Sequence, residues 1–129
     1  KNDCFTGNFG DYSTAIIHFG VNDLTSLTTP DGEITKLKNI IDNLKSKGFK
    51  KIVVLTTIPT KSDTNTNTNI AKYNNLLKSQ KSTLGIDTIL DANILFYSGT
   101  NVITNYFADA VHPNDSGAQK MSGLLDQNL

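Results

Sequence analysis

A carboxylate and an imidazole lie three residues apart near the end of the chain, in the segment Asp109-Ala110-Val111-His112-Pro113. Across a tight turn, Asp109 can reach one imidazole nitrogen, fix the tautomer, and stabilise the imidazolium that forms when the other nitrogen accepts a proton. Pro113 restricts the backbone of His112 to extended conformations, which holds the ring out of a following helix. The pair suits a general base in acyl transfer, although a loop histidine with an acidic neighbour explains this segment alone equally well.

A second polar group, Gly20-Val21-Asn22-Asp23, follows an apolar run. Glycine allows the backbone to turn sharply, and the side-chain amide of Asn22 can donate a hydrogen bond to an anionic oxygen. Taken alone, the better interpretation is an ordinary turn between a strand and a loop, because Gly, Asn and Asp are the usual residues there.

Three short apolar runs predict buried strands at residues 14–19, 51–57 and 86–90. His18 lies on the first of them, and we expect it to be packed or hydrogen-bonded in the core.

Amphipathic segments between these runs predict helices. Thr29 can cap the first, Pro30 suits its first turn, and Gly48 is a plausible stop. Its inner face, at spacings of three and four, comprises Ile34, Leu37, Ile41 and Leu44. The second helix is expected to begin at Ile70, after a solvated loop over residues 61–69.

A last helix is expected after the histidine segment, capped by Asp115 or Ser116. Its predicted inner face comprises Ala118, Met121 and Leu125. Strands that alternate with helices indicate a single α/β domain with a parallel sheet and helices on both faces. Sites in such sheets collect at the carboxyl ends of the strands, which puts residues 20–23 in the crevice.

Together the two polar segments resemble the SGNH (GDSL-type) hydrolase family. Residues 15–23 resemble its G-x-N-D block, and residues 109–117 resemble its D-x-x-H-P block, including the glycine at the start of the last helix. Residues 70–74 look like the family's middle helix. The resemblance covers the chain from about Asp11 onward. It implies a three-layer α/β/α fold with a parallel flavodoxin-like sheet that lacks its first strand and helix.

The resemblance also implies a role for individual residues. His112 resembles the general base that activates a serine and then protonates the leaving alcohol, and Asp109 resembles the residue that orients it. Asn22 resembles the side-chain donor of an oxyanion hole, which stabilises the transition state by about 3–4 kcal/mol in comparable sites. Gly20 would allow close approach of that loop, and Asp23 would be a structural partner of loop N–H groups.

The chain departs from the family pattern in two blocks that precede G-x-N-D: no G-D-S block with its nucleophilic serine occurs in the 129 residues, and Gly7 is not assigned as the oxyanion-hole glycine of the second block. The segment Gly10-Asp11-Tyr12-Ser13 is a near match, but Ser13 begins the first strand, roughly 20 Å from the crevice at ~3.3 Å per residue. Surface serines are common, so we do not assign the role to the other loop candidates, Ser26, Ser62 and Ser98. We expect the nucleophile to lie outside this sequence, and an isolated chain to expose an edge or apolar face and to be unstable or associate.

Composition argues against several other classes of function. Twelve Lys and Arg balance twelve Asp and Glu, and a net charge of zero disfavours nucleic-acid and anionic-membrane partners. No apolar run approaches the ~20 residues of a membrane span. Cys4 is the only cysteine, so no internal disulfide can form, and with two histidines no metal cluster or other cofactor is indicated.

Other polar and aromatic residues have two explanations each. The Asn- and Thr-rich residues 61–69 could bind sugar hydroxyls, although a solvated loop is the better interpretation. Tyr97, Tyr106 and Phe107 could line an acyl or sugar pocket, or pack in the core.

The sequence therefore predicts a serine ester hydrolase that works through an acyl-enzyme. The two blocks look closest to carbohydrate esterases that remove O-acetyl groups from polysaccharides such as xylan, and a lipase or lysophospholipase of the same family is the nearest enzyme alternative. A non-catalytic glycan-binding module without the nucleophile is the alternative from another class, and an unrelated doubly wound domain is the third. Family habit favours secretion, and a separate N-terminal segment carrying the serine is a possible partner.

Overall fold

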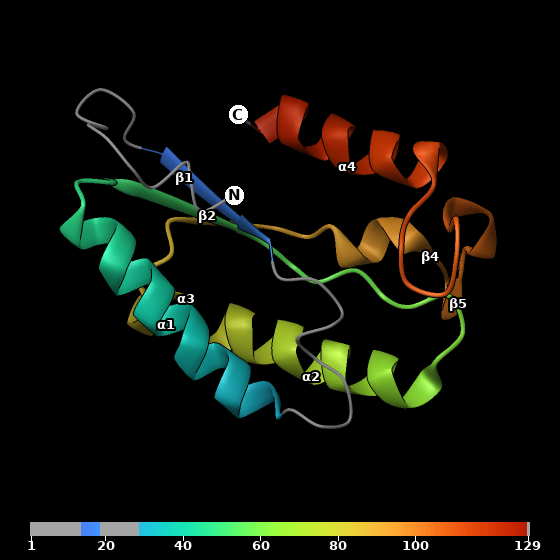
Figure 1. Ribbon diagram of the computed structural model, residues 1–129, viewed down its shortest axis with the longest axis horizontal. Coiled ribbons are helices and arrows are strands. Elements are labelled where there is room, and N and C mark those ends of the chain that lie inside the picture. Colours follow the sequence, from blue (N-terminus) through green and yellow to red (C-terminus); the bar gives the residue numbers. More distant parts are fainter. Residues whose placement is uncertain (1–13, 19–28, 129) are drawn as a thin grey trace.

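A computed structural model describes residues 14–18 and 29–128 of the chain (Figure 1). Three strands, β1 (Thr14–His18), β2 (Lys51–Leu55) and β3 (Thr88–Leu90), alternate with helices. The helices are α1 (Pro30–Ser46), α2 (Thr64–Ser79), α3 (Lys81–Leu84) and α4 (Asp115–Asn128). Between β3 and α4 lie two short 3₁₀ helices and a small hairpin: η3 (Asn93–Phe96), β4 (Tyr97–Ser98), β5 (Asn101–Val102) and η4 (Thr104–Tyr106).

The three longer strands form a parallel sheet in the order β1-β2-β3. Thr14 pairs with Lys51 and His18 with Leu55, and Val53 pairs with Thr88. The strands run in the same direction because helices return the chain between them, α1 after β1 and α2 with α3 after β2. The predicted parallel α/β sheet is confirmed.

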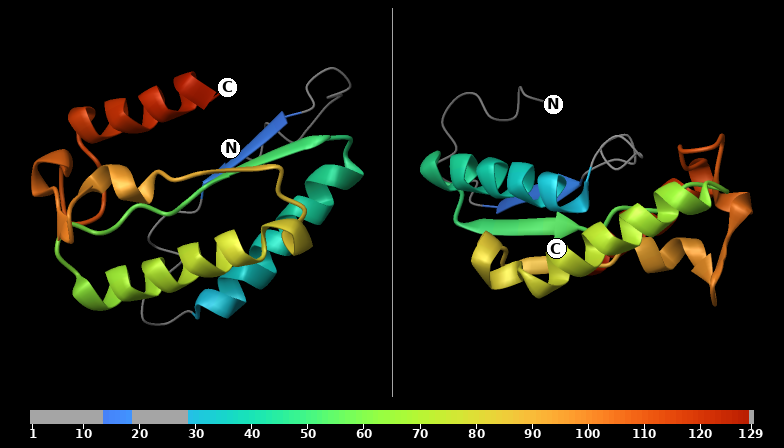
Figure 2. Two further views of the ribbon diagram at one scale, coloured as in Figure 1. Left: turned by 180° about the vertical axis from the view of Figure 1, so that it is seen from behind. Right: turned by 90° about the horizontal axis from the view of Figure 1, so that it is seen from below.

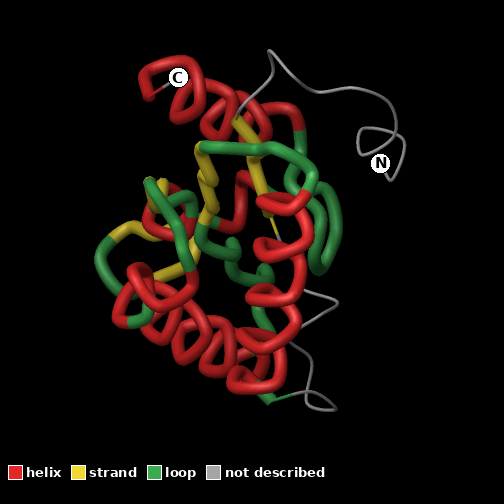
Figure 3. The backbone as a smooth tube through the Cα atoms, turned by 90° about the vertical axis from the view of Figure 1, so that its left-hand side faces the viewer, coloured by secondary structure: helices red, strands yellow, loops and turns green. Residues whose placement is uncertain are grey.

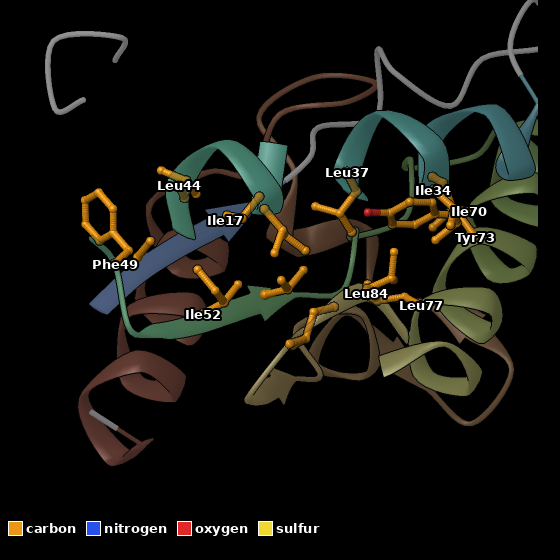
Figure 4. Packing of buried hydrophobic residues seen from close by; sticks show 14 residues of the cluster. Ile17, Ile34, Leu37, Leu44, Phe49, Ile52, Ile70, Tyr73, Leu77 and Leu84 are labelled. Atoms are coloured by element: carbon orange, nitrogen blue, oxygen red, sulfur yellow. The ribbon is translucent and has the colours of Figure 1, made fainter. Parts of the chain in front are cut away.

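Alternate side chains of β2 point into two separate cores, because successive residues of a strand face opposite sides of a sheet. Ile52 and Val54 pack with α1 and α2, and Figure 4 shows this cluster. Val53 and Leu55 belong to the second core, against which Met121, Leu124 and Leu125 of α4 are packed. The sheet therefore lies between α4 and the α1–α2 pair, as Figures 1 and 3 show, and the expected three-layer α/β/α arrangement is confirmed.

Helix α1 follows its sequence signals closely. The hydroxyl of Thr29 accepts a hydrogen bond from the backbone N–H of Gly32 at 3.0 Å, and Pro30 opens the helix. The chain leaves the helix at Lys47 and Gly48, whose φ of 103° favours glycine. The predicted inner face is buried: Ile34, Leu37, Ile41 and Leu44.

Helix α2 begins six residues earlier than predicted. Residues 64–69 were expected to be a solvated loop, yet Asp63 caps a helix that starts at Thr64. The carboxylate of Asp63 accepts hydrogen bonds from the backbone N–H and the hydroxyl of Thr66, at 3.1 and 2.9 Å. Asn67 bonds the backbone N–H and C=O of Thr60 through its side-chain amide. These contacts offset the low helix propensity of Thr and Asn.

Strand β1 buries only one of its faces. Ala15 and Ile17 lie in the α1–α2 core, whereas Ile16 on the opposite face is 48% exposed. His18 shares that exposed face, so its predicted place in the core is wrong. Alternation along a strand at the edge of the described sheet explains the difference. The predicted association of the isolated chain stays a prediction.

Helix α4 is capped by Asn114, whose side-chain oxygen accepts the backbone N–H of Gly117 at 3.0 Å. The predicted caps, Asp115 and Ser116, are instead the first helical residues. Ala118, expected on the inner face, is exposed, and Gly117 is buried in its place. Met121 and Leu125, the other two residues of the predicted inner face, do pack against the second core, so that part of the prediction is confirmed.

Candidate active site

The carboxyl ends of the strands point toward the hairpin β4–β5 and the start of α2, on the right in Figure 1. The loop that carries Asp109 and His112 lies at this end of the molecule. The backbone N–H of Lys61 donates a hydrogen bond to the carbonyl of Ala110 at 2.9 Å. Because Lys61 belongs to the segment between β2 and α2, this bond ties the loop to the edge where α/β proteins place their sites.

Backbone hydrogen bonds close the loop on itself. The N–H of Ala108 donates to the carbonyl of His112 at 2.8 Å, and Phe107 and Pro113 form an isolated antiparallel bridge. The N–H of Asn114 donates to the carbonyl of Tyr106, also at 2.8 Å. Residues 107–113 therefore form a closed turn whose two ends are fastened together.

Asp109 binds both the backbone of this turn and the imidazole. Its Oδ1 accepts the backbone N–H of Val111 at 2.9 Å and that of His112 at 2.7 Å. The Nδ1 of His112 lies 2.9 Å from Oδ2 and 3.1 Å from Oδ1. The backbone bonds from Val111 and His112, followed by the imidazole contact, lower the pKa of Asp109 from 3.8 to about 2. The carboxylate is therefore ionised at every pH at which an imidazole titrates.

The ionised carboxylate determines the form of the neutral ring. A carboxylate only accepts hydrogen bonds, so Nδ1 of His112 must carry the hydrogen that lies between them. In the neutral imidazole this leaves the lone pair on Nε2. The side chain of His112 is 68% exposed, and that of Asp109 is 57% exposed. The arrangement can accept a proton at Nε2 and stabilise the resulting cation from the other side of the ring.

Aromatic packing attaches the start of the turn to Phe96. Phe107 is buried and meets Phe96 in an edge-to-face contact, with ring centroids 5.5 Å apart. Tyr106 meets the same Phe96 ring at 5.9 Å and 83°. These two residues follow the core-packing explanation of the sequence, and they fix the start of the turn to η3.

The comparison with protein families shows which family the chain belongs to. The model of the GDSL-like lipase/acylhydrolase family matches residues 7–120. The chain belongs to this family. The resemblance inferred from residues 15–23 and 109–117 is confirmed at the level of the family.

Solved structures of GDSL-type hydrolases share the fold. A member of the lipolytic protein G-D-S-L family from Veillonella parvula superposes with a TM-score of 0.77 at 19% identity, covering 90% of this chain and 62% of that one. A catalytic mutant of an acetylxylan esterase from Geobacillus stearothermophilus gives 0.72 at 16% identity, with 89% and 58% coverage. The lipase/acylhydrolase from Enterococcus faecalis gives 0.70 at 18%, with 89% and 60%.

The chain thus spans about 60% of the length of these structures. At these identities the similarity supports the fold and does not extend to a substrate. The search of curated proteins gives no match to this chain.

Several of the residues predicted for the candidate site fall outside the part of the chain that the structure describes. Gly20, Asn22 and Asp23 lie outside the described residues, as do Ser13 and Ser26. The structure therefore brings together Asp109 and His112, and the oxyanion roles stay predictions. Of the other serines considered, Ser62 and Ser98 are described, and both are exposed.

A pocket at this end of the molecule combines residues that the sequence analysis considered separately. A pocket of about 480 Å³ lies between the start of α2 and the β4–β5 hairpin, lined by Ser62, Thr64, Tyr97, Thr100 and Asn101 among others. The Asn/Thr-rich stretch and Tyr97 were both named as possible binding residues, but the hairpin that brings Thr100 and Asn101 beside them was not predicted, because two-residue strands leave no periodic signal.

Within residues 14–18 and 29–128, no three His, Cys, Asp or Glu side chains gather in a way that could hold a metal ion. Nor does any helix in those ranges have the length and apolar character needed to cross a bilayer.

Proposed function

We propose that this chain carries the histidine–aspartate half of a serine ester hydrolase, which removes O-acetyl groups from a polysaccharide such as xylan. The observation that carries the proposal is the Asp109–His112 pair, with Nδ1 bonded to an ionised carboxylate and the ring exposed. A buried structural histidine would need neither feature. Membership of the GDSL-like family supports the ester-hydrolase class.

The proposed reaction has two halves. His112 accepts the serine proton at Nε2 while the serine oxygen attacks the acetyl carbonyl, and the tetrahedral oxyanion forms. Collapse breaks the bond to the sugar oxygen, which receives the proton from His112, and leaves an acetyl-enzyme. Water then attacks the acetyl-enzyme with the same base, and acetate and the free serine are released. Throughout, Asp109 remains ionised and stabilises the imidazolium.

Asn22 is the proposed side-chain donor to the oxyanion. Its place in the sequence, shortly after β1, supports this role, because the carboxyl end of β1 is at the same sheet edge as the histidine turn. Gly20 is proposed to allow the close approach of that loop, and Asp23 to bind its N–H groups. Asn22 would stabilise charge that develops only in the transition state.

The nucleophile is proposed to come from polypeptide outside these residues, because no Gly-Asp-Ser sequence occurs among the 129. The proposed preference for acetylated polysaccharides rests on the amino-acid sequences of the two blocks, residues 15–23 and 109–117, and on the fold shared with the acetylxylan esterase. A lipase of this family would share the same chemistry and differ in its acyl pocket. The chain alone is therefore expected to be inactive.

The test is acetate release from acetylated xylan, with p-nitrophenyl acetate as a small ester. The chain alone should release nothing and should gain no mass with a fluorophosphonate probe. The chain fused behind a Gly-Asp-Ser-bearing segment from a family member should hydrolyse both esters, and His112→Ala should abolish this activity. Labelling of the chain alone that disappears in His112→Ala would locate the serine inside it. A folded fusion that is inert toward every ester would refute the hydrolase proposal.

A further inference from the structure

The pocket between α2 and the β4–β5 hairpin has none of the residues 107–113 of the histidine turn in its lining. Its volume of about 480 Å³ suits a small ligand. Small-molecule sites in proteins usually measure ~300–1,000 Å³. One wall comes from residues 61–71 and the other from residues 97–102. Figures 1 and 2 show these two segments converging at the end of the molecule that carries the histidine turn.

Free hydrogen-bonding groups surround this pocket. The side chains of Ser62, Thr64, Thr100 and Asn101 form no hydrogen bond with one another or with other residues of the described chain. Each hydroxyl offers one donor and two acceptor positions, and the amide offers both kinds. The wall thus presents several polar groups that no residue in the described ranges 14–18 and 29–128 occupies.

Tyr97 adds a flat apolar surface. Its ring is half-buried at the start of the hairpin and lines the pocket beside Val102. Burial raises the pKa of the Tyr97 phenol above 10.0, so the group stays protonated and can both donate and accept. An aromatic face next to unpaired hydroxyls and amides suits the ring of a sugar, which has apolar C–H faces and polar edges.

The walls are held in place before any ligand binds. The side chain of Asn67 bonds the N–H, hydroxyl and C=O groups of Thr60, at 2.6, 2.8 and 3.2 Å. The hydroxyl of Thr60 in turn accepts the N–H of Asp63, which caps α2. A wall fixed in this way loses little conformational entropy when a ligand binds.

The pocket is joined to the histidine turn by one residue. Lys61 lines the pocket, and its backbone N–H donates a hydrogen bond to the carbonyl of Ala110, between Asp109 and His112. A polysaccharide with one sugar in the pocket would continue past this turn. No Asp or Glu belongs to the described lining, which combines hydroxyl and amide side chains with the apolar surface of Ala71, Tyr97 and Val102.

We infer that this pocket is a glycan subsite that binds a sugar unit of the chain whose acetyl ester reaches His112. The inference rests on the proposed esterase function and deepens it, since it assigns the substrate class to carbohydrate and not to lipid. Ser62, Thr64, Thr100 and Asn101 bind sugar hydroxyls, and Tyr97 packs against a ring face.

The experiment is an NMR titration, with xylotetraose, of the chain fused behind the Gly-Asp-Ser-bearing segment. Xylotetraose carries no acetyl group, so the completed enzyme cannot deacetylate it during the titration. Backbone amide shifts are expected to change at residues 61–64 and 97–102. The double variant Ser62→Ala/Thr100→Val should weaken binding about tenfold, since two hydrogen bonds to the sugar are lost. The matched control is Ser82→Ala/Thr104→Val, which removes the same groups from exposed positions outside the pocket and should bind as the parent does.

The outcomes separate this inference from the proposed function. Binding should persist in His112→Ala, because the subsite does not use the base. Sugar binding at the pocket with no acetate release by the completed enzyme would retain the subsite and refute the esterase. Ester hydrolysis with no shifts at the pocket, or equal affinity of the two double variants, would overturn the subsite. Displacement of the same signals by octanoate and not by xylotetraose would also overturn it, in favour of an acyl pocket.

Discussion

A methyl group added at Gly117 should destabilise the protein, although alanine favours helices. Gly117 is buried in the first turn of α4. A Cβ atom there would lie 2.5 Å from the carbonyl oxygen of Tyr106, 2.9 Å from Cβ of Pro113 and 3.1 Å from the ring of Phe96. The oxygen cannot simply move away, because it already accepts the N–H of Asn114 at 2.8 Å.

The size of the effect follows from two opposing contributions. Overpacking of a buried site typically destabilises by about 1–3 kcal/mol, and the contact with a backbone oxygen puts Gly117→Ala in the upper part of that range. The helix propensity of alanine over glycine returns up to about 1 kcal/mol. The expected net loss is about 1–2 kcal/mol of unfolding free energy, or about 4–8 °C in Tm for a domain of this size.

Gly123 provides the matched control in the same helix. A Cβ at Gly123 meets nothing within 4 Å, so Gly123→Ala keeps the propensity gain without the clash. It should stabilise the protein by about 0.5–1 kcal/mol. Urea and thermal unfolding followed by circular dichroism measure both variants. If Gly117→Ala proves as stable as Gly123→Ala, the close packing of α4 on the histidine turn is wrong.

Three further predictions concern hydrogen bonds at the sheet edge and in the turn. Asn74→Leu removes two buried hydrogen bonds to Thr57, of 2.9 and 3.0 Å, and should lower the free energy of unfolding in urea by about 2–4 kcal/mol. Asn75→Leu, on the exposed side of the same helix, is the control and should change it by less than about 0.5 kcal/mol. Equal effects of the two variants would contradict the buried pairing. The chemical shift of the Asp109 carboxyl carbon, followed by NMR, should titrate near pH 2. Because folding lowers the pKa of this carboxyl group, its contribution to stability should be complete above about pH 4 and lost as the pH falls toward 2. A midpoint near pH 4 would show that the backbone N–H bonds to the carboxylate are absent. Asp109→Asn keeps an oxygen for those N–H groups but places an amide opposite Nδ1, so ¹⁵N spectra should show His112 with its hydrogen on Nε2; an unchanged tautomer would show that the carboxylate does not set it.

Elements with a continuous local signal were predictable from the sequence. The apolar runs of β1 and β2 and the four-residue stripe of α1 are each contained within a few turns or residues of chain, and all are confirmed. The start of α2 was missed because the cap at Asp63 is supported by Thr60 and Asn67, which act together only once the chain has folded. His18 was assigned to the wrong environment because the alternation of a strand does not reveal which face a neighbouring helix covers.

The candidate site also has a part that follows from local sequence and a part that depends on the folded chain. Asp109 and His112 are three residues apart, so one turn brings them together, and their contact follows from the local sequence. The pocket joins residues 61–71 to residues 97–102, and nothing in either segment specifies the other. Contacts at that separation depend on how the whole chain folds, so the sequence predicted the Asp109–His112 pair and named Tyr97 and residues 61–69 as candidates, but did not predict that they share one pocket.

The geometry of the turn explains why a single carboxylate can be responsible for both structure and chemistry. Oδ1 of Asp109 holds the backbone N–H groups that form the turn, and Oδ2 lies closest to the imidazole. The backbone bonds keep the carboxylate ionised, and the ionised carboxylate fixes the ring with its lone pair on Nε2. The orientation of His112 is therefore a property of the turn at residues 107–113, whose first residue, Phe107, packs on Phe96, and it does not depend on where the serine comes from. If His112 is the general base that we propose, its ring is oriented before a nucleophile meets it, as the proposed histidine–aspartate half-site requires.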